Sequence, residues 1–179
     1  EYPIDVFYIA DSLGSLYPSQ ILSITKLIKN KWKKGIGIHA HDNLGMALAN
    51  TIIAIKNGAN WVDTTIAGMG RGPGNCKTEE FLIEKSLVEN NQINVSPILS
   101  LIKKYFIKMK DEYQWGTNPY YYLSGKFKIH PSYIQSLLDN KIISDDDMIM
   151  LITKLKELKA TKFKPNYLTG DLFKLKGEH

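Results

Sequence analysis

The chain has 179 residues, of which 44% are hydrophobic and 23% charged, and its formal net charge is +5. These values are typical of a soluble globular protein, and the length suits one domain or part of a larger one. No apolar run reaches the roughly 18 residues of a membrane helix, no secretion signal is visible, and the single cysteine, Cys76, excludes an internal disulfide framework, so we expect a cytoplasmic protein.

The first half of the chain repeats one pattern three times. Short apolar strands are predicted over residues 5–11, 36–41 and 61–67, and each precedes a predicted helix, over 18–34, 44–57 and about 76–90. Such strand–loop–helix repeats are typical of an α/β fold with parallel strands and right-handed crossovers. In these folds the functional groups gather at the carboxyl ends of the strands.

The second half is predicted to be helical. Helices are expected over residues 96–109, 131–140 and 144–159, with an aromatic link at 113–125. An apolar stripe on the last helix predicts core packing and consists of Met148, Leu151, Ile152, Leu155 and Leu158. We therefore expect an α/β part over residues 1–92 and a helical extension over 93–179. The whole charge excess lies in residues 101–179, but no nucleic-acid motif accompanies it, so we expect neither nucleic acid nor a membrane as a partner.

Two histidines occupy one predicted strand. His39 and His41 are two residues apart, and alternate residues of a strand face the same side. Both imidazoles would therefore project toward one point, where they could offer two nitrogen ligands to a metal. Polar residues also follow the neighbouring strands, at Asp11 and in the Gly-rich stretch 68–75.

These segments together resemble a known enzyme family. The sequences Asp-Ser-Leu-Gly at residues 11–14, His-Ala-His-Asp-Asn-Leu-Gly at 39–45 and Val-Asp-Thr-Thr-Ile-Ala-Gly-Met-Gly from 62, ending in Gly-Asn at 74–75, are the relevant blocks. They resemble the 3-hydroxy-3-methylglutaryl-CoA lyase-like superfamily of metal-dependent aldolases and lyases. The loop 68–75 is most similar to the 4-hydroxy-2-oxovalerate aldolase branch, and it lacks the glutamate that is usual in the acyl-CoA-dependent synthases.

The resemblance implies roles for individual residues. His39 and His41 would bind a divalent metal (Mn²⁺, Mg²⁺ or Zn²⁺), with Asn75 as a further ligand or an orienting group. Asp11 and Asn43 would line the metal's surroundings or the substrate pocket. Arg71 could bind a substrate carboxylate or phosphate, because a guanidinium forks onto such groups.

Three aromatic residues and one histidine of the second half are weaker candidates. One of Tyr120, Tyr121 and Tyr122 could approach the pocket and protonate the enolate, with Tyr121 as our choice, although interface or core packing is the interpretation that we favour for such a run. His130 precedes Pro131 and is interpreted as a structural residue at a helix start. The resemblance does not transfer the family's reactive cysteine to Cys76, which follows Asn75 rather than preceding it.

The resemblance covers only strands six to eight of a TIM barrel, which needs eight strands and about 250 residues. The family's Asp-x-x-x-Arg-Asp strand, with the third metal ligand and a catalytic arginine, does not occur in this sequence. We therefore expect an incomplete barrel that is the C-terminal part of a longer enzyme, inactive alone. Its expected partners are the missing N-terminal half of the barrel, a second copy of the chain and a small 2-oxo acid.

The expected reaction is carbon–carbon bond cleavage or formation beside a 2-oxo acid, through a metal-stabilised enolate. Two alternatives stay open. One is an acyl-CoA-dependent 2-oxo-acid synthase, and the other is a non-catalytic interaction module that retains the fold.

Overall fold

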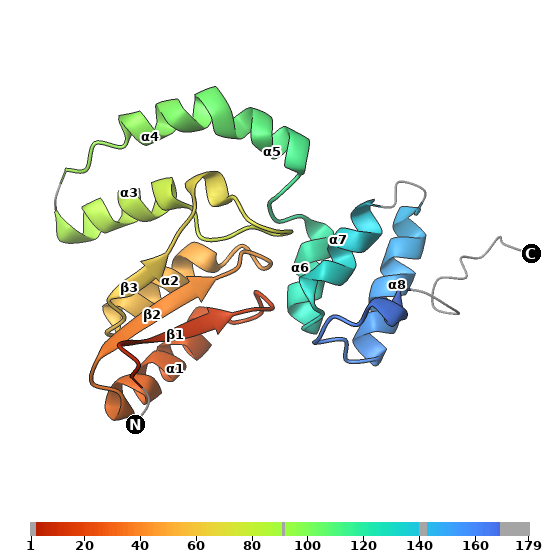
Figure 1. Cartoon of the computed structure of the whole chain (residues 1–179), viewed down its shortest axis with the longest axis horizontal. Coiled ribbons are helices and arrows are strands. Elements are labelled where there is room, and N and C mark those ends of the chain that lie inside the picture. The colour runs from red at the N-terminus through yellow and green to blue at the C-terminus, as the bar shows by residue number, and fades with distance from the viewer. Residues whose placement is uncertain (1–2, 91, 140–142, 169–179) are drawn as a thin grey trace, which may run out of the picture.

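The computed structural model describes residues 3–90, 92–139 and 143–168 (Figure 1). Three strands form one parallel sheet in the order β1 (Val6–Asp11), β2 (Gly35–Ala40) and β3 (Trp61–Asp63). They are followed by α1 (Pro18–Lys31), α2 (Ala47–Lys56) and α3 (Thr78–Glu89). The predicted α/β architecture with three parallel strand–helix units is thereby confirmed. The third strand was predicted too long, because β3 ends at Asp63 and Ile66–Gly68 form a 3₁₀ turn, η1.

Local sequence explains where α1 begins and ends. Pro18 occupies the first helical turn, where its missing N–H is harmless, and the Gln20 side chain accepts a hydrogen bond from the Tyr17 backbone N–H at 3.0 Å. After the helix, the Trp32 indole donates to the Gly35 carbonyl at 2.8 Å, which turns the chain into β2.

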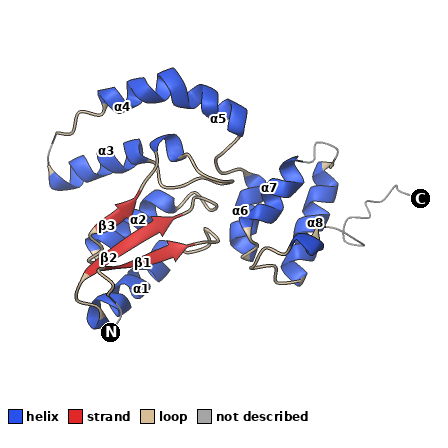
Figure 2. Ribbon diagram, in the orientation of Figure 1, coloured by secondary structure: helices blue, strands red, loops and turns tan. Residues whose placement is uncertain are grey.

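One face of the sheet packs against α1 and α2, as Figure 2 illustrates. Ile9, Ile36 and Ile38 bury their side chains on this face, together with Ile21 of α1 and Ala54 of α2. The alternate residues point to the opposite face, where Tyr8, Ala10 and Trp61 are exposed and two glycines of β2 lie between them. The histidines therefore belong to the uncovered face.

Beyond α3 the described chain is helical. It contains α4 (Ser96–Leu101), the π-helical turn η2 (Ile102–Phe106) and α5 (Ile107–Tyr113), then α6 (Pro119–Phe127), α7 (Pro131–Asp139), α8 (Asp145–Glu157) and the short η3 (Pro165–Tyr167). The last residue of the helix predicted over 131–140 lies outside the described residues. Among the described residues, no helix is both long and apolar enough to cross a membrane.

Helix α6 corrects the prediction of a link over residues 113–125. Asn118 caps the helix by accepting the backbone N–H groups of Tyr120 and Tyr121, and Pro119 follows as its first residue. Gly125 suggested a loop, but it lies inside the helix. The residue there is glycine because a Cβ would lie only 3.0 Å from the Gly14 carbonyl oxygen. A packing requirement, not a turn, explains this glycine.

The helices α6–α8 have a hydrophobic core of their own, around Tyr133, Ile134 and Leu137. Four predicted stripe residues, Met148, Leu151, Ile152 and Leu155, are buried in it. The fifth was predicted wrongly, because α8 ends at Glu157 and Leu158 is 43% exposed. The sheet and α6–α8 thus have separate cores, while a boundary between residues 92 and 93 stays a prediction.

Candidate metal and substrate site

His39 and His41 stand at the carboxyl end of β2 with their ring centroids 4.8 Å apart and their planes nearly perpendicular. His39 Nδ1 lies 3.1 Å from an Asp63 carboxylate oxygen, and His41 Nδ1 lies 2.8 Å from the Asp11 carbonyl oxygen. Because both partners only accept hydrogen bonds, each Nδ1 carries a proton, and in the neutral form of each imidazole the lone pair is then on Nε2. Anchoring of this kind is usual for metal-binding histidines.

Burial favours the neutral form of His41. The pKa of His41 is lowered chiefly by burial, with smaller effects in the same direction from His39 and Arg71, while the Asp11 carbonyl opposes the shift. A neutral imidazole is the form that binds a metal or accepts a proton.

Asn75 is brought to His41 by the Gly-rich loop. The two residues form an antiparallel bridge, and the Asp42 backbone N–H donates to the Gly74 carbonyl at 2.9 Å. Gly74 has φ +79°, and a Cβ there would overlap the Gly68 carbonyl, so the loop can close only with glycine at this position. The Asn75 amide nitrogen donates to the Met69 carbonyl at 3.2 Å.

The Asn75 carbonyl oxygen, Oδ1, is buried and has no hydrogen-bond partner among the described residues. A buried oxygen without a partner is costly, so it is a natural position for a cation ligand. Two imidazoles and an amide oxygen suit a divalent ion, and we conclude that these donors fit one. The described residues contain no cluster of three His, Cys, Asp or Glu side chains that could hold a metal.

Asp11 and Asn43, the predicted substrate-binding residues, are both buried. The two carboxylate oxygens of Asp11 accept the backbone N–H groups of Ser15 and Leu16 at 3.0 Å, which fixes the loop after β1. The Asn43 side-chain amide donates to Ser124 Oγ at 3.0 Å, and the Thr117 hydroxyl donates to the Asn43 backbone carbonyl at 2.9 Å. These side chains therefore hold the loops of the site, and a direct role toward substrate stays a prediction.

Tyr121 packs against the Gly-rich loop. A Cβ at Gly72, which has φ +61°, would lie 3.1–3.2 Å from the Tyr121 ring and hydroxyl. Burial raises the pKa of Tyr121 to about 12, with a further contribution from Asp139, and Arg71 acts in the opposite direction. Tyr120 instead donates to Asp145 of α8 at 2.5 Å.

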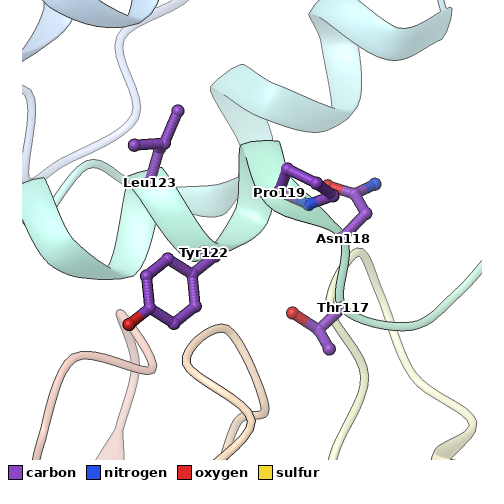
Figure 3. Close-up of a pocket in the computed structure, with 5 residues that line it drawn as sticks. All are labelled: Thr117, Asn118, Pro119, Tyr122 and Leu123. Atoms are coloured by element: carbon purple, nitrogen blue, oxygen red, sulfur yellow. The ribbon is translucent and has the colours of Figure 1, made fainter.

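Tyr122 belongs to a hollow of about 530 Å³ on α6, lined also by Thr117, Asn118, Pro119 and Leu123 (Figure 3). In this view Tyr122 projects from α6 toward the loops that follow the strands, and Leu123 projects to the other side of the helix.

His130 lies close enough to the site for two of its residues, Arg71 and His41, to affect the pKa of the His130 imidazole. Its pKa is lowered first by burial and then by Arg71 and His41. Its Nδ1 accepts the Ser132 backbone N–H at 3.3 Å, at the start of α7. A structural role for His130 stays a prediction.

The helices α6–α8 dock onto the loops at the strand ends, toward which the arrows of β1 and β2 point in Figure 1. The Trp115 indole donates to the Ala67 carbonyl at 3.0 Å, and the Gly116 N–H donates to the Gly72 carbonyl at 2.9 Å. Lys126 of α6 donates to the Tyr17 hydroxyl at 2.8 Å. The structure thus gathers segments more than 100 residues apart in the sequence around one set of loops.

Asp63 and Tyr8 are site residues that the sequence analysis missed. Asp63 pairs with His39 in the parallel register, and its other carboxylate oxygen accepts the Tyr8 hydroxyl at 3.1 Å. The signal was present in the order of the strands, because the last residue of β3 lies beside the end of β2 once the strands are parallel. Register, rather than any motif, identifies this pair.

Comparison with known proteins decides the family. Residues 2–102, more than half of the chain, match the HMGL-like family. This chain belongs to the HMGL-like family. The match includes the three strands, both histidines, Arg71 and Asn75, and it ends before α5, so the helices α6–α8 lie beyond it.

The HMGL-like chain has relatives named 4-hydroxy-2-oxovalerate aldolase. The protein from Brevibacillus brevis is 43% identical over 81 residues, which are 45% of this chain and 24% of the relative. The protein from Thermus thermophilus is 43% identical over 79 residues, which are 44% and 23% of the two chains. The chain spans about a quarter of the length of these relatives.

Solved structures agree with the fold. The N-terminal domain of a candidate aldolase from Bacteroides vulgatus is 33% identical, with a TM-score of 0.69 over 77% of this chain and 46% of that one. The carboxyl transferase domain of Rhizobium etli pyruvate carboxylase is 17% identical, with a TM-score of 0.64 over 89% and 29% of the two chains, and it supports the fold alone.

Proposed function

We propose that this chain supplies part of the active site of a divalent-metal-dependent aldolase or lyase that acts on a 2-oxo acid. The observation that carries the proposal is the pair His39 and His41, whose Nδ1 atoms are both anchored at the end of one strand. Asn75, which forms a backbone bridge with His41, adds a buried side-chain oxygen without a hydrogen-bond partner among the described residues. The relatives named 4-hydroxy-2-oxovalerate aldolase support the choice of reaction and substrate class.

His39, His41 and Asn75 would hold the metal, with Mn²⁺, Mg²⁺ and Zn²⁺ as the candidate ions. When bound, a divalent ion supplies Lewis-acid polarisation of the carboxylate and keto oxygens of a 2-oxo acid.

Arg71 and Tyr121 have complementary tasks in this proposal. Arg71, exposed on the Gly-rich loop, would bind the substrate carboxylate through its guanidinium fork. Tyr121, with a pKa of about 12, keeps its proton at neutral pH. It would donate that proton only to a strongly basic centre, such as the carbon released when the carbon–carbon bond breaks.

The uncovered sheet face needs a cover in this proposal. Tyr8 and Trp61 expose 38% and 53% of their surface there, on the side to which His39 points. We infer that an N-terminal half of the barrel covers this face and contributes the remaining ligand and the base. A second copy of the chain in the assembly is also proposed, as is a cytoplasmic location.

The test is a titration of the chain with Mn²⁺ and with Zn²⁺ by calorimetry. His39→Ala and His41→Ala should each weaken binding at least about tenfold, since each removes one ligand. His130→Ala is the matched control, because it removes an imidazole that is not a proposed ligand, and it should leave the affinity unchanged. Absence of binding both by the wild-type chain and by a longer protein that includes the N-terminal half of the barrel would overturn the proposal and favour a non-catalytic interaction module.

The substrate class is tested with pyruvate. Pyruvate should bind the Mn²⁺-loaded chain, and Arg71→Lys should weaken that binding because an ammonium cannot fork onto a carboxylate. Binding that requires acetyl-CoA would instead favour the 2-oxo-acid synthase.

A further inference from the structure

We propose that Tyr8 is a positioning residue for the metal ligand His39, acting through Asp63 across the uncovered face of the sheet. The inference rests on the proposed function, because it concerns one of the proposed metal ligands. It assigns a role to an exposed tyrosine and to a glycine of β2 that neither the family's sequence blocks nor packing explains.

The contacts form a chain from one edge strand to the other. The Tyr8 hydroxyl of β1 donates to one Asp63 carboxylate oxygen of β3 at 3.1 Å, and the other oxygen lies 3.1 Å from His39 Nδ1 of β2. The Asp63 side chain is 47% exposed, so without a second partner its carboxylate could rotate away from the imidazole. Tyr8 restricts that rotation, and Asp63 in turn fixes the ring and the protonated nitrogen of His39.

Gly37 is the residue that makes this reach possible. It lies opposite Tyr8 in the β1–β2 register, and a Cβ at Gly37 would lie 2.5–2.7 Å from three atoms of the Tyr8 ring. The ring therefore occupies the space that a side chain would fill in the middle strand. Glycine weakens a strand interior, and close approach of another group is a reason for it to occur there.

The two histidines are oriented by different edge strands. His39 is oriented by β3 through Asp63, and His41 is oriented by β1 through the Asp11 carbonyl at 2.8 Å. The first anchor is an exposed side chain and the second is a backbone carbonyl, so only His39 needs a second residue to hold its anchor. This difference is why Tyr8 acts on one histidine and not on the other.

The experiment uses Tyr8→Phe, which removes only the hydroxyl and keeps the ring over Gly37. In the metal-free chain, ¹⁵N imidazole spectra should show His39 changing from one tautomer with a protonated Nδ1 to a mixture, while His41 is unchanged. Zn²⁺ and Mn²⁺ affinities should fall about threefold to tenfold, at or below the range usual for loss of a group behind a ligand. Tyr105→Phe, at an exposed tyrosine of the π-helical turn, is the matched control and should change neither reading.

Two further variants separate positioning from a general structural effect. Gly37→Ala should reproduce the spectrum of Tyr8→Phe, because the new methyl group displaces the ring. In an Asp63→Ala background, Tyr8→Phe should have no further effect on affinity, because the group through which it acts is gone. Thermal unfolding should change little in Tyr8→Phe, since the bond it removes is exposed.

The outcomes distinguish the inference from the proposed function. An unchanged His39 tautomer and unchanged affinity in Tyr8→Phe would overturn the inference while leaving the metal site intact. If neither the wild-type chain nor a longer protein that includes the N-terminal half of the barrel binds an ion, the proposed function fails, and the tautomer of His39 in the metal-free chain still tests whether Tyr8 orients it.

Discussion

Gly14→Ala should destabilise the protein strongly, because Gly14 is where the loop after β1 meets the loop after β2. Gly14 has φ +55°, and an added Cβ would overlap the Asn43 side chain. Asn43 is fully buried and bonded to Ser124 of α6, so it cannot move aside without breaking that contact.

The magnitude follows from three terms. The left-handed backbone conformation costs alanine about 1–2 kcal/mol, and overpacking in a well-packed region adds about 1–3 kcal/mol. Loss of the Asn43–Ser124 hydrogen bond adds about 1 kcal/mol. Reduced freedom of the unfolded chain returns about 1 kcal/mol, which leaves a net loss of about 2–5 kcal/mol.

Urea unfolding followed by circular dichroism measures this loss, and Gly45→Ala is the matched control. Gly45 also has a left-handed conformation, with φ +67°, but nothing lies within 4 Å of its added Cβ. It should therefore cost only the backbone term, about 1 kcal/mol after the unfolded-state correction. Equal losses in the two variants would refute the reasoning, because they would mean that the contact with Asn43 contributes nothing.

Two further predictions concern the two hydrophobic cores. Burial raises the pKa of Cys76 to about 11 from 9.0, so the thiol ionises at a lower pH in the unfolded state than in the folded state. The free energy of unfolding should therefore fall as the pH rises from 9 toward 11, by at most about 3 kcal/mol. The decline should be smaller in Cys76→Ala, as urea titrations at several pH values would reveal. In the core of α6–α8, Ile134→Ala should cost about 2–5 kcal/mol because the side chain is fully buried, whereas Leu158→Ala, at a 43% exposed position, should cost well under half of that. Similar losses for both would contradict the assigned core.

The sequence was sufficient to predict the parallel sheet and the segments that meet at its carboxyl edge. Short apolar segments and their strand–helix spacing indicate parallel strands, and the carboxyl ends of parallel strands lie together. His39, His41 and the Gly-rich loop follow from that rule. Helix α6 did not, because Pro119 and Gly125 suggest a link unless the Asn118 cap and the contact with Gly14 are known.

Partners that depend on register or docking could not be predicted. Asp63 becomes a partner of His39 only when β2 and β3 are aligned, and Tyr8 reaches Asp63 only because Gly37 leaves room. The bond between Asn43 and Ser124 joins residues 81 positions apart, and no local pattern encodes it. Leu158 continued an apolar stripe, but periodicity alone does not show where a helix ends.

The two proposed parts of the site depend on different portions of the fold, and Gly125→Val should separate them. The metal donors are anchored within the sheet and its loops, whereas Tyr121 reaches the Gly-rich loop only through the docking of α6. Branched carbons at position 125 would collide with the Gly14 carbonyl and Leu44, since a Cβ already lies 3.0 Å from atoms of both. We therefore expect Gly125→Val to undock α6 and expose Trp115, which a red shift in its fluorescence would report. The Zn²⁺ affinity should stay within about twofold of wild type, because no metal donor is anchored to α6. A parallel loss of metal affinity would mean that α6 also positions the histidines.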